Sequence, residues 1–156
     1  MPHPPMLKTY YQGLLMGLDT FAQYQRHAFN PKQAHSYETI LQLFESFKLE
    51  MAFVIENAGQ TLPQSLAPYQ SISAFFAFRR IKMLKGAEIL WQASAQDYQK
   101  GLAMMERYLH KHQQKLPAPW SELIISQIHQ TYALGGKLHL LNLPEQALAH
   151  PSPAEP

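Results

Sequence analysis

The clearest pattern along the chain is the recurrence of apolar residues three to four positions apart, within segments that contain no proline. This spacing places apolar side chains on one face of an α-helix. The strongest example runs from Tyr37 to Ala58 and continues for over five turns. A second apolar stripe, over Met6–Ala28, predicts another helix that carries Leu7, Tyr11, Leu14, Leu18, Phe21 and Ala28. On that helix Gly13 and Gly17 share one face and favour the close approach of a neighbouring helix.

Prolines and glycines mark where these helices begin and end. Asn30 and Pro31 predict a turn, after which Pro31 can start the second helix. Gly59, directly after Asn57 and Ala58, predicts the end of that helix through a left-handed glycine. The segment Gly59–Gln70 contains Pro63 and Pro68, so it is predicted to be an extended linker.

The proline-free window Tyr69–Leu116 is longer than most globular helices, which run to about 20 residues. We expect two helices there, divided near Ala93–Ala95, where Ser94 can cap the second one. A single helix that bends at Gly86 or Gly101 is the open alternative. A last helix is predicted to start with Ser121 as its N-cap and to end at Gly135 and Gly136.

Together these elements predict an all-α protein with one domain, a bundle of four to five helices over residues 6–148. Residues 1–5 and 149–156 are expected to be disordered tails. The predicted core contains Leu14, Leu18, Phe44, Met51, Ile55, Phe76, Met83, Leu102, Leu109, Ile124 and Ile128.

Composition narrows the possible functions. The chain has no cysteine, so disulfides, thiolate metal sites and a cysteine nucleophile are excluded. The N-terminus lacks the charged start and apolar run of a secretory signal, and no apolar run approaches the ~20 residues of a membrane span. We therefore expect a cytoplasmic protein. No motif indicates a metal site or a cofactor.

The charges are unevenly distributed, although the net charge is only +2. The segment Ser71–Trp91 carries Arg79, Arg80, Lys82 and Lys85 against Glu88, whereas Lys32–Ala58 has a net charge of −2. Phe75, Phe76 and Phe78 accompany these cations. Cations mixed with aromatic rings are typical of single-stranded nucleic-acid binding, so this basic helix supports an alternative function as a nucleic-acid binder.

A third possibility comes from the segment Arg107–His112, which reads Arg-Tyr-Leu-His-Lys-His. An arginine, four intervening residues and a histidine resemble the motif of HEPN-type ribonucleases, which are small helical bundles. The resemblance implies that the two residues act across a dimer interface, where Arg107 stabilises developing charge on an RNA phosphate and His112 transfers a proton. Tyr108 stands where that family usually has a polar residue.

The leading hypothesis is a non-enzymatic helical bundle that binds another protein or associates with itself. No nucleophile triad, phosphate-binding glycine loop or pair of carboxylates for acid–base chemistry is present. Several apolar residues lie off the main stripes, which indicates an exposed apolar surface of the kind found at interfaces. The predicted interface residues on the first helix are Tyr10, Met16 and Tyr24.

Overall fold

The computed structural model describes residues 6–63 and 77–141. Within these ranges the long elements are α1 (Met6–Arg26), α2 (Pro31–Asn57), α4 (Ala87–His112) and α5 (Ala118–Lys137). The described residues 77–83 are helical and precede α4, and a 3₁₀ turn, η1 (Gln113–Lys115), follows α4. The described residues contain no strand, so the predicted all-α bundle is confirmed.

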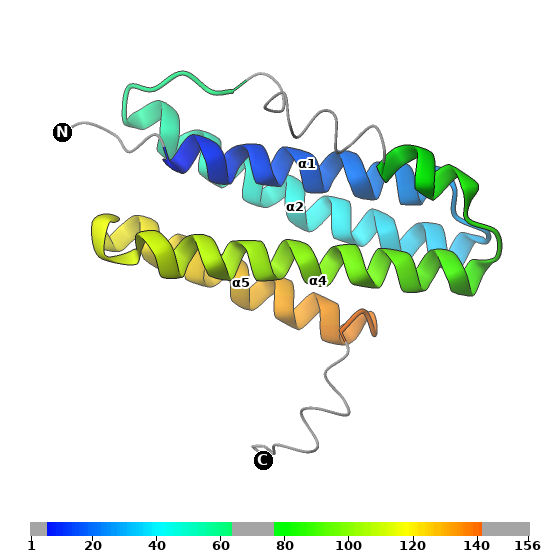
Figure 1. Ribbon diagram of the computed structural model, residues 1–156. Coiled ribbons are helices and arrows are strands. Elements are labelled where there is room, and N and C mark those ends of the chain that lie inside the picture. Colours follow the sequence, from blue (N-terminus) through cyan, green and yellow to red (C-terminus); the bar gives the residue numbers. More distant parts are fainter. Residues whose placement is uncertain (1–5, 64–76, 142–156) are drawn as a thin grey trace, which may run out of the picture.

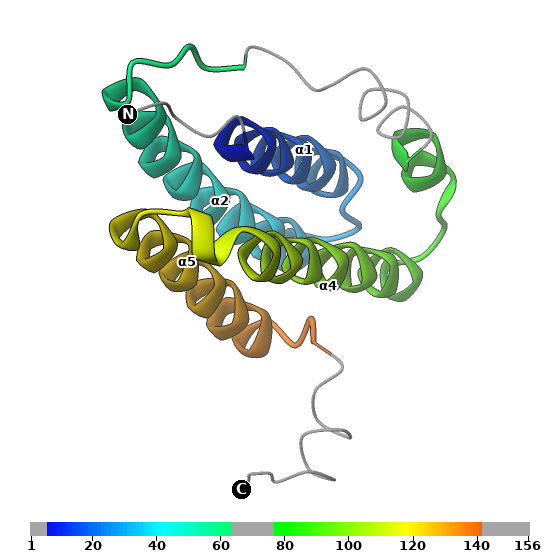
Figure 2. The ribbon, with the colours of Figure 1, turned by 60° about the vertical axis from the view of Figure 1, so that its left-hand side comes forward.

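The helices form two antiparallel hairpins that pack side by side. α1 pairs with α2 and α4 pairs with α5, while α1 also contacts α4 and α2 contacts α5 (Figures 1 and 2). α2 ends at the opposite end of the bundle from the start of α4 (Figure 1). The chain between them therefore has to span the length of the bundle, which is the topology of a four-helix bundle with one long crossover.

The predicted boundaries of the first two helices agree with the structure. The side chain of Asn30 accepts a hydrogen bond from the Gln33 backbone amide at 2.8 Å, and Pro31 occupies the first helical position. After α2, Gly59 adopts a φ of 78°, a left-handed conformation that favours glycine. Residues close to each boundary therefore determine where the helices of the α1–α2 hairpin begin and end.

The predicted division at Ala93–Ala95 is wrong. α4 runs through Ser94 without interruption, because the Ser94 hydroxyl donates a hydrogen bond to the Trp91 carbonyl inside the helix at 2.7 Å and caps nothing. The helix is instead interrupted just before α4, where Gly86 has a φ of 102°. Gly86, one of the two positions at which a bend was the alternative, therefore separates two helices.

Both predicted ends of the last helix are also displaced. α5 begins at Ala118, directly after Pro117, and the Ser121 hydroxyl donates to the Ala118 carbonyl instead of capping the helix. At the other end α5 continues through both glycines to Lys137. Gly135 is buried, and a Cβ there would lie 2.7 Å from the Tyr98 ring, so this glycine is required for packing.

Aromatic rings form the centre of the bundle. Phe21 of α1 lies within 6.0 Å of both Phe44 of α2 and Tyr98 of α4, measured between ring centroids. Phe44 and Tyr98 stack with an interplanar angle of 15°. Tyr24 and Tyr37 extend this cluster with no exposed surface. Edge-to-face and stacked pairs of this kind join three helices at one place.

Most of the predicted core is confirmed. The buried members are Leu14, Phe44, Met51, Ile55, Leu102, Ile124 and Ile128, with Leu18 and Leu109 partly buried against them. The prediction for Met83 is wrong, since 72% of its surface is exposed. Met83 is the last residue of the helical segment 77–83, in which Ile81 is buried and Met83 is exposed. Phe76, both predicted tails and residues 64–70 of the predicted linker lie outside the described residues.

Candidate functional site

The expectation that Tyr10 and Tyr24 belong to an exposed apolar surface is wrong. Tyr10 is 5% exposed and Tyr24 is fully buried, because α1 packs against α2 on one side and α4 on the other. The Tyr10 hydroxyl donates to Gln127 at 2.8 Å. The pKa of Tyr10 is raised well above its ordinary value, mainly by burial and to a smaller extent by the nearby Tyr108 and Glu50. Met16, the third predicted interface residue, is only partly exposed.

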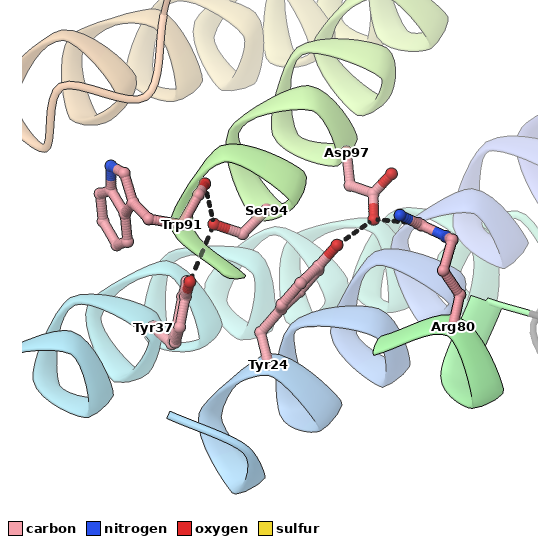
Figure 3. A network of polar contacts seen from close by, with 6 residues as sticks. All are labelled: Tyr24, Tyr37, Arg80, Trp91, Ser94 and Asp97. Carbon is pink, nitrogen blue, oxygen red and sulfur yellow. Dashed lines mark hydrogen bonds and ion pairs between the residues drawn. The ribbon is translucent and has the colours of Figure 1, made fainter. Parts of the chain in front are cut away.

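Tyr24 belongs to a polar cluster where α1, α4 and the segment 77–83 meet. Its hydroxyl donates to Asp97 at 2.5 Å, and the Arg80 guanidinium contacts the same carboxylate oxygen at 3.2 Å (Figure 3). In the same view the Tyr37 hydroxyl donates to Ser94 at 2.9 Å. Burial, with a smaller opposing effect of Ser94, raises the pKa of Tyr37 to about 12. These contacts join the three elements and engage one carboxylate oxygen of Asp97 with both Tyr24 and Arg80.

The four predicted nucleic-acid-binding cations are exposed, but they do not share one surface. Arg79, Arg80 and Lys82 spread over about 160° of the helical segment 77–83, while Lys85 follows in the non-helical link before α4. Arg80 is already paired with Asp97. A polyanion could therefore contact only one or two of these charges at once.

The two residues of the predicted ribonuclease motif also point in different directions. Arg107 is exposed and His112 is half-buried, and their five-residue separation places them about 140° apart around α4. The His112 ring lies 4.7 Å from that of Tyr108, and its Nδ1 is shielded from water with no hydrogen-bond partner among the described residues. Burial, then Lys111 and Lys115, lowers the pKa of His112. Within one chain these two side chains do not converge on a common substrate position.

A groove on the outer side of the α1–α2 hairpin has a different character, and we call it the acidic groove. Its volume is about 710 Å³. Its apolar floor comes from both helices, and polar or charged side chains complete its lining. The residues that line it are Leu15, Leu18, Asp19, Ala22, Glu38, Leu41, Gln42, Glu45, Ser46, Lys48 and Leu49.

The charges of the acidic groove are only partly compensated. Lys48 pairs with Glu45 at 3.1 Å. Asp19 and Glu38 have no ion-pair partner among residues 6–63 and 77–141. Asp19 is exposed as a residue, yet neighbouring groups remove water from its carboxylate and so raise its pKa. The groove therefore keeps two uncompensated carboxylates beside aliphatic side chains.

Exposed apolar residues extend this surface along α2. Leu49, which lines the acidic groove, is 61% exposed, and Phe53, one turn further on, is 68% exposed. Both lie off the main apolar stripe of α2. Large apolar side chains next to a groove are typical of interaction surfaces.

A second groove lies between α1 and α4, and we call it the glycine groove. Two adjoining cavities of about 120 and about 210 Å³ share the lining residues Gly13, Gly17, Phe44, Gly101 and Met104. A Cβ on Gly13 would meet the Met104 side chain at 3.0 Å, and one on Gly17 would meet Phe44 at 3.4 Å. Side chains, and not a closely approaching helix backbone, therefore face these glycines, contrary to the prediction.

Sequence reasoning missed Asp19 and Gly101 as parts of these surfaces. Asp19 has a readable signal, because the aliphatic residues Leu15, Leu18 and Ala22 surround it on α1. Gly101 has no such local signal. Its place in a groove depends on which helix packs opposite α4.

Comparisons with protein-family models, with curated proteins and with solved structures find no match to this chain. In the part of the chain that the structure describes, no helix is both long and apolar enough to cross a membrane. The same part contains no group of three or more histidine, aspartate or glutamate side chains placed to hold a metal ion. Functional inference therefore depends on the two grooves themselves.

Proposed function

We propose that this protein acts by binding another protein, and that the acidic groove takes an amphipathic helix with lysine or arginine on its polar face. The observation that carries the proposal is an aliphatic floor bordered by the carboxylates of Asp19 and Glu38, which have no ion-pair partner in the described part of the chain. The apolar face of the helix fills the floor, and its cations pair with the carboxylates. This is the helix-in-groove mode of recognition.

The dimensions of the groove support a helix as its ligand. Two antiparallel helices present a continuous channel between them, into which the ridge of a third helix can pack. The volume of about 710 Å³ is open along the hairpin, and Leu49 and Phe53 continue the apolar surface beyond it. Aliphatic side chains supply most of the binding energy in such a contact, while the carboxylates select against acidic partners.

A titration with synthetic peptides tests this proposal. The probe is an amphipathic helix of about five turns made from leucine and lysine, compared with a leucine–glutamate peptide of the same pattern. We expect the lysine peptide to bind, and the glutamate peptide to bind at least about tenfold more weakly. Reversing two charges with Asp19→Lys and Glu38→Lys should weaken binding of the lysine peptide by a similar factor.

The matched control reverses two other exposed carboxylates, Glu88 and Glu122, which do not line the acidic groove. Glu88→Lys with Glu122→Lys changes the net charge equally, so a purely general electrostatic attraction would fall in both double variants. Equal losses in the two variants would refute the groove as the site. Light scattering of the protein alone tests self-association, and a dimer lost in the Asp19 and Glu38 variant would make a second copy the partner.

A further inference from the structure

We propose that the glycine groove is a binding site for a small, uncharged aromatic molecule of about two fused rings. This site is separate from the acidic groove and lies on the other side of α1. The argument begins with its size. A cavity of about 120 Å³ is close to the 150 Å³ of an engineered apolar cavity that holds benzene. The adjoining space of about 210 Å³ accommodates a second ring.

The space exists because three helical positions lack side chains. Gly13 and Gly17 lie on α1, and Gly101 lies opposite them on α4. A Cβ on Gly101 would have no neighbour within 4 Å, so no contact inside the described protein requires glycine there. Glycine in a helix interior is unfavourable compared with alanine. An unfilled position of this kind inside an apolar groove leaves room for a ligand.

The lining determines the chemical class of the ligand. Phe44 borders both cavities, and Phe21 and Tyr98 border the larger one, so aromatic rings face the ligand. Such rings favour a flat aromatic partner through stacked or edge-to-face contacts. Met104, 38% exposed, is a flexible side chain that can adjust to the shape of a ligand.

The polar groups at the two ends argue for a neutral ligand. The end near Phe21 carries Asp97 and the exposed Lys100. Asp97 is already bonded to Tyr24 and Arg80, so its charge is compensated. The opposite end has Thr9, Tyr10 and Tyr108, none of which is charged at neutral pH. A charged ligand would lose its hydration without gaining a buried partner.

The test uses the full chain with 2-naphthol as the neutral aromatic probe and decanoate as a flexible anionic probe. We expect 2-naphthol to bind at neutral pH and to shift the NMR signals of residues that line the glycine groove. Decanoate should bind at least about tenfold more weakly. Gly101→Leu fills the groove from a position with open space, so this variant should weaken 2-naphthol binding by about tenfold or more.

The matched control is Gly136→Leu, also a helical glycine whose Cβ would have no neighbour within 4 Å, but on α5 and outside the groove. Melting curves of both variants establish that they are folded, and Gly101→Ala serves as a smaller change should Gly101→Leu unfold. The proposal is overturned by the absence of 2-naphthol binding to the native chain. It is equally overturned by undiminished binding to a folded Gly101 variant, or by decanoate binding more tightly than 2-naphthol.

Discussion

Hydrogen bonding separates Tyr108 from four other tyrosines in the core. Tyr10, Tyr24, Tyr37 and Tyr98 each donate their hydroxyl to a partner on another helix, as in the bond from Tyr98 to the Thr131 carbonyl at 2.6 Å. The Tyr108 hydroxyl is equally shielded from water but has no partner among the described residues. A buried polar group without a hydrogen bond destabilises the folded state by about 1–3 kcal/mol.

This difference predicts opposite effects of the same chemical change. Tyr108→Phe removes an unbonded hydroxyl, so we expect the free energy of unfolding to stay level or to rise by about 1 kcal/mol. Tyr98→Phe removes a bonded hydroxyl and leaves the Thr131 carbonyl short of a donor, so we expect a loss of about 1 kcal/mol or more. Urea denaturation measures both. A Tyr108→Phe variant destabilised as much as Tyr98→Phe would mean that this hydroxyl has a partner after all.

At the scale of single helices, boundaries that depend on neighbouring residues are predictable from sequence. The Asn30 cap, Pro31 at the first position and the left-handed Gly59 all act within one turn of the residue concerned. Ser94 shows the opposite case. Its local pattern suggests a cap, but its hydroxyl bonds within α4 and to Tyr37, a partner 57 positions away. Tertiary contacts therefore override the local preference.

The candidate sites are less predictable than the helices for the same reason. The grooves form between elements, so their residues become neighbours only after α1 has packed against α2 and α4. Tyr10 and Tyr24 lie off the main apolar stripe of α1, yet both are buried. A helix covered on two sides buries residues beyond its main stripe, and periodicity in a single helix does not reveal how many neighbours it has.

The two consecutive glycines of α5 provide a test at this scale. A Cβ on Gly135 would lie 2.7 Å from the Tyr98 ring and 2.9 Å from Leu141, so Gly135→Ala should destabilise the protein by about 1–3 kcal/mol. Gly136 is exposed and has open space around it, so Gly136→Ala should stabilise by about 0.4–1 kcal/mol through the lower entropy of the unfolded chain. Thermal denaturation distinguishes them, and changes of the same sign would contradict the packing.

At the scale of the whole molecule, buried tyrosines link stability to alkaline pH. The ordinary pKa of tyrosine is 10.0, and burial raises that of Tyr37 to about 12. The pKa values of Tyr10, Tyr24, Tyr98 and Tyr108 are also raised, with burial as the largest cause in each. Between the ordinary and the raised values, the unfolded chain has lost phenolic protons that the folded chain still binds. Stability therefore decreases as pH rises through this range.

Below pH 10 we expect the contribution of these tyrosines to the free energy of unfolding to be independent of pH. Above pH 10 we expect a cooperative loss of structure. Each raised tyrosine removes up to about 1.4 kcal/mol per pH unit. Five acting together remove up to about 7 kcal/mol per unit, which matches a total stability of about 5–15 kcal/mol within about one to two units. Far-UV circular dichroism and tyrosinate absorbance, recorded on the same samples, measure unfolding and ionisation. Unfolding and the ionisation of these tyrosines should occur at the same pH, because the rings reach water only when α1, α2 and α4 separate. Full tyrosinate absorbance in a chain that keeps its helicity would contradict the buried aromatic centre that joins these helices.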